Sequence, residues 1–134
     1  MVDIDIDEEV HELRGVFPDI SRSDFYRLNN DSIGAEVTYE TEDYFTDDFD
    51  VLIEFDYGYP DSAPNAWIQH PDIDNGCPHD YGEDEYGNTR ACYVHYNQWK
   101  PWYTSFDASV MIKTWVYAYC NWKKTGNWDW EEAH

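Results

Sequence analysis

The residue of this chain best suited to chemistry is Cys92, which lies in the stretch Gly87–Pro101 between a glycine-led turn and a Trp-Lys-Pro step. A thiol acts as a nucleophile only when it is partly ionised and accessible, and a polar loop provides both more readily than a core does. Arg90, His95 and His70 could lower the pKa of Cys92, although the sequence alone does not place them near it. The alternative is that Cys92 is a small apolar residue facing inward, since buried free cysteine is common.

His70, Pro71 and Asp72 form a second candidate group at the end of a predicted strand. If the following loop folds back, the Asp72 carboxylate could lie near Cys92 and orient an attacking amine or accept a proton from it. The competing interpretation is structural. In that case the His70 ring bonds to backbone, and Asp72 is a solvated turn residue.

Two cysteine–histidine pairs indicate a metal site instead of a nucleophile. Cys77, His79, Cys92 and His95 are ligand types that suit tetrahedral zinc, although a Cys-x-His pair is more closely spaced than usual. In a closed zinc site the Cys92 thiolate would be a metal ligand and could not act as a nucleophile, so the two hypotheses exclude each other. Cys120 falls in the middle of a predicted helix, where core filling is the expected role of a cysteine.

The acidity of the chain limits the partners it can have. The sequence carries 29 Asp and Glu against eight Lys and Arg, a formal net charge of −21. Such a surface repels phosphate, so nucleic acid is not expected as a direct partner. Either an acidic face recruits a basic partner, or the acidity is a halophilic adaptation to a cytoplasm whose salt screens the self-repulsion. Because the carboxylates are spread along nearly the whole chain, adaptation is favoured.

The composition predicts a folded cytoplasmic protein. A hydrophobic fraction of 42%, with 19% aromatic residues, argues for a packed core despite the charge. Three cysteines, an odd number, fit a reducing compartment better than a disulfide framework. The first ten residues lack the basic and apolar segments of a signal peptide, and no run of 18 apolar residues predicts a membrane span.

The elements that must position these residues predict an α+β fold with one domain, residues 1–134, whose core covers about 8–125. A short amphipathic helix is predicted over residues 8–17, and a longer one from Ser105 or Asp107 to about Lys124. Between them, four short strands predict an antiparallel four-stranded meander: 25–28, 33–39, 49–57 and 66–69. Apolar residues alternate along 49–57, so one of its faces is expected to be buried and the other mostly wet. Residues 71–90 read as a long polar loop, which in a compact domain is functional or disordered.

Between the two predicted helices, several short motifs follow one another in a fixed order: Tyr59-Pro60, Pro64, His70-Pro71-Asp72, Cys92 and Trp99-Lys100-Pro101. This order resembles the ubiquitin-conjugating enzyme (UBC) fold, with its Tyr-Pro step, His-Pro-Asn tripeptide, active cysteine and Trp-x-Pro step. The resemblance covers about residues 8–125 and implies that Cys92 is the thioester-forming nucleophile and that His70-Pro71 is part of the tripeptide scaffold. Asp72 stands where eukaryotic members have Asn, and an insertion holding Cys77 and His79 lengthens the segment before Cys92.

The C-terminal part of the sequence resembles one particular group of proteins with this fold. The second helix and the residues after it carry a Trp…Tyr…Trp…Thr-Gly-x-Trp pattern: Trp115, Tyr119, Trp122, Thr125, Gly126 and Trp128. The pattern is similar to that of stand-alone conjugating-enzyme-like proteins of CBASS anti-phage operons. That family is thought to form a thioester with the C-terminus of a cGAS/DncV-like nucleotidyltransferase and to join it to a target amine. The resemblance implies a transferase with a protein partner that donates a C-terminal carboxyl, an amine acceptor, and no cofactor.

A rival function from another class is a non-catalytic UBC-like adaptor. It would bind a protein through aromatic surface, for which the candidates are Trp99, Trp102, Trp128 and Trp130. Core packing is the ordinary role of most such residues. A zinc-stapled binding module is the third hypothesis.

Overall fold

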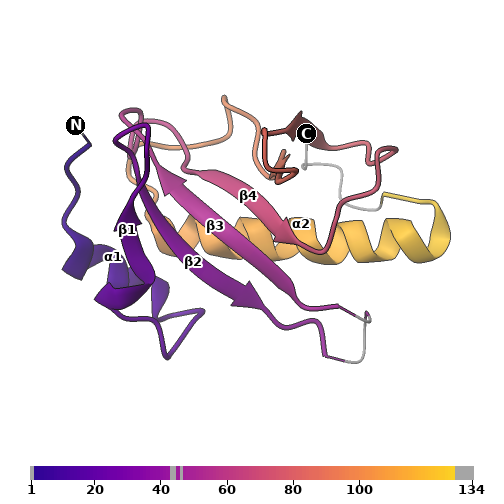
Figure 1. Ribbon diagram of the computed structural model, residues 1–134, viewed down its shortest axis with the longest axis horizontal. Helices are drawn as coiled ribbons and strands as arrows, with labels where there is room; N and C mark the ends of the chain where they lie inside the picture. The colour runs from indigo at the N-terminus through magenta and orange to yellow at the C-terminus, as the bar shows by residue number, and fades with distance from the viewer. Residues whose placement is uncertain (1, 43–44, 46, 129–134) are drawn as a thin grey trace.

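The computed structural model describes residues 2–42, 45 and 47–128. A long helix, α2 (Ser105–Thr125), lies across one face of an antiparallel sheet, and a short helix, α1 (Ile6–Leu13), lies beside the end of the sheet formed by β1 (Phe25–Arg27) (Figure 1). In chain order the elements are α1 (Ile6–Leu13), the 3-10 helix η1 (Arg22–Asp24), β1 (Phe25–Arg27), β2 (Ile33–Tyr39), β3 (Phe49–Phe55), β4 (Asn65–His70), β5 (Asp80–Glu83), β6 (Thr89–Ala91) and α2 (Ser105–Thr125).

The sheet has six strands in the order β1-β2-β3-β4-β6-β5, and each neighbouring pair is antiparallel. The predicted α+β class is confirmed. The prediction of a four-stranded sheet is wrong, because β5 and β6 form a hairpin that continues the sheet beyond β4. The predicted loop over residues 71–90 therefore contains two strands.

The β5–β6 hairpin gives no hydrophobic pattern because it is built by turn chemistry at the edge of the sheet. Three of the four residues of β5, Asp-Tyr-Gly-Glu, are exposed. In its turn, the Asp84 carboxylate accepts hydrogen bonds from the N–H groups of Tyr86 and Asn88, each at 2.9 Å. Gly87 follows with a φ of 81°, a conformation that glycine adopts without strain.

Strand β3 forms the centre of the sheet and is buried on both faces. Leu52 and Glu54, which point away from the α2 side, are only 9% and 5% exposed. The prediction that this face is mostly wet is therefore wrong. The Glu54 carboxylate tolerates burial because four side chains donate hydrogen bonds to it at 2.7–3.0 Å: Asn30, Ser32, Asn65 and Trp67.

Helix α2 begins at Ser105, and its cap is the preceding residue rather than Ser105 or Asp107. Thr104 is the N-cap and forms a capping box with Asp107, and Gly126 ends the helix with a φ of 80°. The helix packs a row of fully or nearly fully buried side chains against the sheet: Ala108, Ile112, Trp115, Val116, Tyr119 and Cys120. The predicted helix, from Ser105 or Asp107 to about Lys124, is confirmed.

Helix α1 covers residues 6–13 rather than the predicted 8–17. Asp5 caps it by accepting a hydrogen bond from the Glu8 N–H at 3.3 Å, and Gly15 lies just beyond its end. Phe17, which the prediction included in the helix, instead packs edge-on against Tyr39 of β2 with ring centroids 5.0 Å apart. In the described part of the chain, no helix is both long and apolar enough to cross a membrane.

Candidate functional site

Cys92 lies immediately after β6 and is almost closed off from solvent, with 4% of its surface exposed. Its N–H donates a hydrogen bond to the carbonyl oxygen of His79 at 3.1 Å, which fixes the residue against the segment that leads into β5. The Tyr81 hydroxyl, from β5, lies beside the Cys92 side chain and favours its thiolate form, which lowers the pKa of the thiol. The β5–β6 hairpin therefore positions Cys92 and also covers it.

The pKa of the Cys92 thiol is raised from its ordinary value. Burial is the largest cause, and the Asp80 carboxylate adds to it. The Tyr81 hydroxyl and the Arg90 guanidinium oppose these effects, since both stabilise a thiolate. Arg90 lies over the ring of Tyr81 at 4.5 Å from the ring centroid, so the two groups act as one unit beside the sulfur.

The other two cysteines have less favourable surroundings for a thiolate. Burial raises the pKa of Cys77 and of Cys120 to about 12. Cys120 is fully buried in α2, which confirms the prediction that it fills the core. Cys92 is thus the thiol whose burial is opposed by both a hydroxyl donor and a guanidinium.

Sequence motifs that are far apart in the chain converge around the segment that carries Cys92. The Trp99 indole N–H donates to the carbonyl oxygen of Pro60 at 2.8 Å, which joins the Trp-Lys-Pro step to the Tyr-Pro step. The Tyr93 hydroxyl donates to the carbonyl oxygen of Pro64. Because both bonds are made by buried side chains that follow Cys92 in the chain, they fix the segment that leaves it.

A cavity of about 280 Å³ lies beside the segment that carries Cys92, although Cys92 itself does not line it. It is lined by the residues on either side of Cys92 in the sequence, Ala91 and Tyr93, and by the pair Tyr81 and Arg90. The rest of its lining comes from the Tyr-Pro loop, the start of β4 and the Trp99 segment: Asp56, Ser62, Ala63, Pro64, Asn65, Val94, Tyr96 and Trp99.

The structure does not bring His70 or Asp72 to Cys92. Trp67 of β4 pairs with Arg90 of β6, so Cys92 lies level with the start of β4, whereas His70 is the last residue of β4. At about 3.4 Å per residue, the five positions between them correspond to about 17 Å. Asp72 is exposed beyond that far end.

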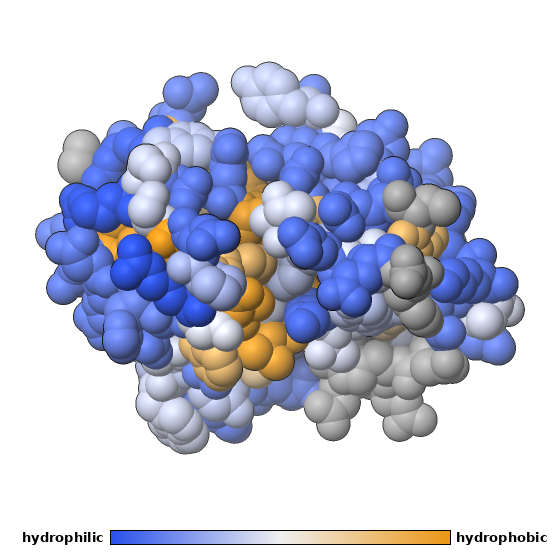
Figure 2. Space-filling view, turned by 90° about the horizontal axis from the view of Figure 1, so that it is seen from below, coloured by the Kyte–Doolittle hydropathy of each residue, from blue (hydrophilic) through white to orange (hydrophobic). Residues whose placement is uncertain are grey.

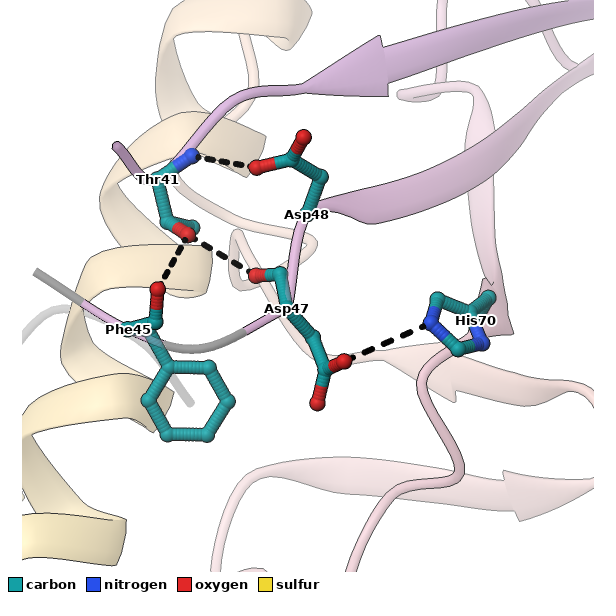
Figure 3. A network of polar contacts seen from close by, with 5 residues as sticks. All are labelled: Thr41, Phe45, Asp47, Asp48 and His70. Carbon is teal, nitrogen blue, oxygen red and sulfur yellow. Dashed lines mark hydrogen bonds and ion pairs between the residues drawn. The ribbon is translucent and has the colours of Figure 1, made fainter. Parts of the chain in front are cut away.

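His70 instead faces the β2–β3 connection. Its Nε2 lies 3.7 Å from the carboxylate of Asp47, and Figure 3 shows the two side chains pointing toward each other. Buried Thr41 fixes this connection, because its hydroxyl donates to the carbonyl oxygen of Asp47 at 2.8 Å and its N–H donates to the Asp48 carboxylate at 3.1 Å. The His70 ring thus lies near a carboxylate rather than bonded to backbone as the structural alternative expected.

The four residues of the zinc hypothesis do not come together either. Among the described residues, no group of three or more His, Cys, Asp or Glu side chains could hold a metal ion. The His79 ring packs against Trp128 with centroids 4.7 Å apart, and the His95 Nδ1 lies 2.6 Å from the Asn97 side-chain oxygen. Each ring is thus engaged elsewhere.

The tryptophans proposed for an adaptor surface separate into two groups. Trp99 is buried, and Trp128 packs against His79 and Trp115. Trp102 is 74% exposed and remains a candidate contact residue. Trp130 lies outside the described residues.

Tyr81 is the site residue that the sequence did not reveal, although Arg90 was a candidate. Tyr81 belongs to β5, whose polar sequence predicts no strand, so nothing placed its side chain beside a cysteine eleven residues later. An Asp-Gly-rich turn such as the one at Asp84–Gly87 is the signal that could have indicated the hairpin.

Comparison with known proteins indicates the family of the chain. No curated protein matches the chain significantly. The family model for the type II CBASS E2 protein matches residues 9–134, which is nearly the whole chain. The chain therefore belongs to the type II CBASS E2 family, which has an E2-like role in CBASS anti-phage systems.

Proposed function

We propose that this protein is a conjugating-enzyme-like transferase in which Cys92 forms a thioester with the C-terminus of a protein partner. The Cys92 thiolate attacks an activated C-terminal carbonyl, the activating group leaves, and an amine then displaces the thiolate to give an amide. The proton of the amine passes to solvent. By resemblance to its family, the donor is a cGAS/DncV-like nucleotidyltransferase.

The observation that carries the proposal is the environment of the three thiols. Of the three thiols, Cys92 is the one whose thiolate is favoured by both the Tyr81 hydroxyl and the Arg90 guanidinium, and a cavity lies beside its segment of the chain. Its own N–H is already donated to His79, so an oxyanion has to be stabilised by other donors. The Tyr81 hydroxyl and the Arg90 guanidinium are two such donors beside the sulfur. His70 and Asp72 have no direct part in this chemistry, because both lie at the far end of β4.

Co-expression with a cGAS/DncV-like nucleotidyltransferase, followed by non-reducing electrophoresis and intact-mass measurement, tests the nucleophile. The wild-type protein is expected to form an adduct that thiols cleave. Cys92→Ser is expected to give an ester that resists thiols, and Cys92→Ala to give no adduct. Cys77→Ser is the matched control and should keep the wild-type adduct. A thiol-labile adduct formed by Cys92→Ala would contradict the proposal.

The second candidate, a binding-only adaptor, is favoured by the burial of Cys92 and the exposure of Trp102. It predicts no covalent adduct in any sample. Partner binding would then be unchanged in Cys92→Ala and weakened in Trp102→Ala, which a pull-down with the same partner measures.

A further inference from the structure

The second half of strand β2 lacks a strand partner on one side. β1 pairs only with residues 33–35 of β2, whereas β3 pairs with the whole strand from Ile33 to Tyr39. In the part of the chain that the structure describes, β3 is therefore the only strand paired with residues 36–39. An unpaired strand edge exposes backbone N–H and C=O groups that another extended chain can pair with.

A groove of about 500 Å³ runs along this free edge. Five consecutive residues of the chain, 36–40, line it. Because side chains alternate between the two faces of a strand, a groove on one face would be lined by every second residue. Lining by consecutive residues places this groove beside the backbone edge of β2.

The groove has an apolar wall and an acidic rim. The wall is formed by the segment after α1 and by the α2-facing side of β2, with Val16, Phe17, Ile20, Val37 and Tyr39. The rim carries five carboxylates, of which Asp19, Glu36, Glu40 and Glu42 are exposed and Asp24 is half-buried. Lys113 is the single basic residue among those that line the groove. Figure 2 shows apolar side chains exposed along a hollow in the middle of this side of the molecule, with hydrophilic side chains to either side.

We propose that the free edge of β2 is a docking site for an extended segment of a protein partner in which apolar residues alternate with Lys or Arg. Such a segment would add to the sheet beside residues 36–39, with its apolar side chains toward Phe17 and Val37 and its basic side chains toward Glu36 and Glu40. The alternation follows from β2 itself, since Val37 and Tyr39 are buried while Glu36 and Glu40 are exposed.

The charge of the groove selects this occupant over a second copy of the chain. Every copy carries a formal net charge of −21, so two acidic rims would repel each other. The docking site is also separate from Cys92, because β3 and β4 lie between β2 and β6 in the sheet. A partner can therefore occupy the edge while Cys92 remains available.

A blocked heptapeptide of alternating lysine and valine is the probe for this site, with a glutamate–valine peptide as its acidic counterpart. Binding is measured by calorimetry in 150 mM KCl, and its location by amide chemical-shift changes in the ¹⁵N-labelled protein. The lysine peptide is expected to bind, with the largest shifts at residues 36–40, and the glutamate peptide is expected not to bind.

Two charge-matched variants separate docking from general attraction to an acidic protein. The variant Asp19→Lys, Glu40→Lys, Glu42→Lys is expected to weaken binding at least tenfold. The control Glu8→Lys, Asp61→Lys, Glu85→Lys changes the net charge equally at exposed positions outside the groove and is expected to keep the affinity within twofold.

Equal losses in the two variants, shifts centred elsewhere, or no binding at 1 mM peptide would each overturn the proposal. Self-association of the free protein by sedimentation, abolished by the groove variant alone, would also overturn it and assign the edge to a second copy.

Discussion

The Cys92 thiol is nearly inaccessible, and the side chain that contacts it from the β5–β6 hairpin is Tyr81. Tyr81 itself is 53% exposed and carries Arg90 on its ring. A hydrogen bond to a thiolate lowers the pKa of the thiol, and the ring also shields the sulfur from reagents. Tyr81 thus has two opposite effects on the reactivity of Cys92.

Tyr81→Phe separates these two effects, because it removes the hydroxyl and keeps the ring. The pKa of Cys92 is already raised by burial, and loss of the hydroxyl is expected to raise it further. Since the thiolate is the reactive form, the alkylation rate of Cys92 should fall at a given pH, and its rise with pH should move to higher pH.

Peptide-level mass spectrometry of iodoacetamide labelling between pH 7 and 10 measures this profile for Cys92 separately from the other cysteines. Tyr86→Phe, an exposed tyrosine in the turn of the same hairpin, is the control and should leave the profile unchanged. A Tyr81→Phe profile that coincides with the wild type would show that the hydroxyl does not act on the sulfur.

At the scale of elements, helix α2 and Cys92 are joined through one carbonyl group. The His79 carbonyl oxygen accepts hydrogen bonds from the Trp115 indole N–H at 2.8 Å and from the Cys92 N–H at 3.1 Å. Trp115 is fully buried and stacks on Tyr119 of the next turn with centroids 5.5 Å apart. The helix therefore supports the position of the candidate nucleophile as well as the core.

Trp115→Phe removes the indole N–H and part of the buried ring. We expect the free energy of unfolding to fall by about 1–3 kcal/mol, from one lost hydrogen bond and a small cavity. Urea denaturation followed by far-UV circular dichroism measures the change, because tryptophan fluorescence would itself be altered. Trp122→Phe, at a half-buried position on the same helix, should cost less than half as much. Equal losses would indicate that the bond to His79 contributes nothing specific.

At the scale of the whole molecule, the charge of −21 is a cost to folding that salt can reduce. Only three ion pairs occur among the described residues, and two of them join exposed or half-exposed side chains with a Lys or an Arg. Most carboxylates are therefore balanced by solvent and counterions rather than by basic side chains.

We expect the urea midpoint of unfolding to rise when KCl is increased from 0.1 to 1 M, because the Debye length falls from about 10 Å to about 3 Å. A sucrose solution of equal osmolality is the control, since it excludes itself from the protein surface without screening charge. A midpoint that does not rise, or that rises equally in sucrose, would argue against the halophilic interpretation of the acidity.

The sequence by itself determined the features that depend on local spacing. Apolar residues at helical spacing predict α2 and its buried face, alternation predicts β2 and β3, and the order of the Tyr-Pro, Cys and Trp-Lys-Pro motifs indicates the family. Each of these signals lies within a few residues of the chain or in the order of short motifs. It can therefore be recognised in the sequence without knowledge of the tertiary structure.

Contacts between residues that are distant in the sequence could be known only from the tertiary structure. The register of β4 with β6 places His70 far from Cys92, although both residues belong to the ordered set of motifs in the sequence. The hairpin that brings Tyr81 to the thiol is held by backbone pairing and an Asp84 turn, neither of which leaves a hydrophobic pattern. The free edge of β2 exists because β1 begins only at Phe25, opposite Ala35, with η1 directly before it. Strand pairing is a property of two segments that neither segment specifies alone.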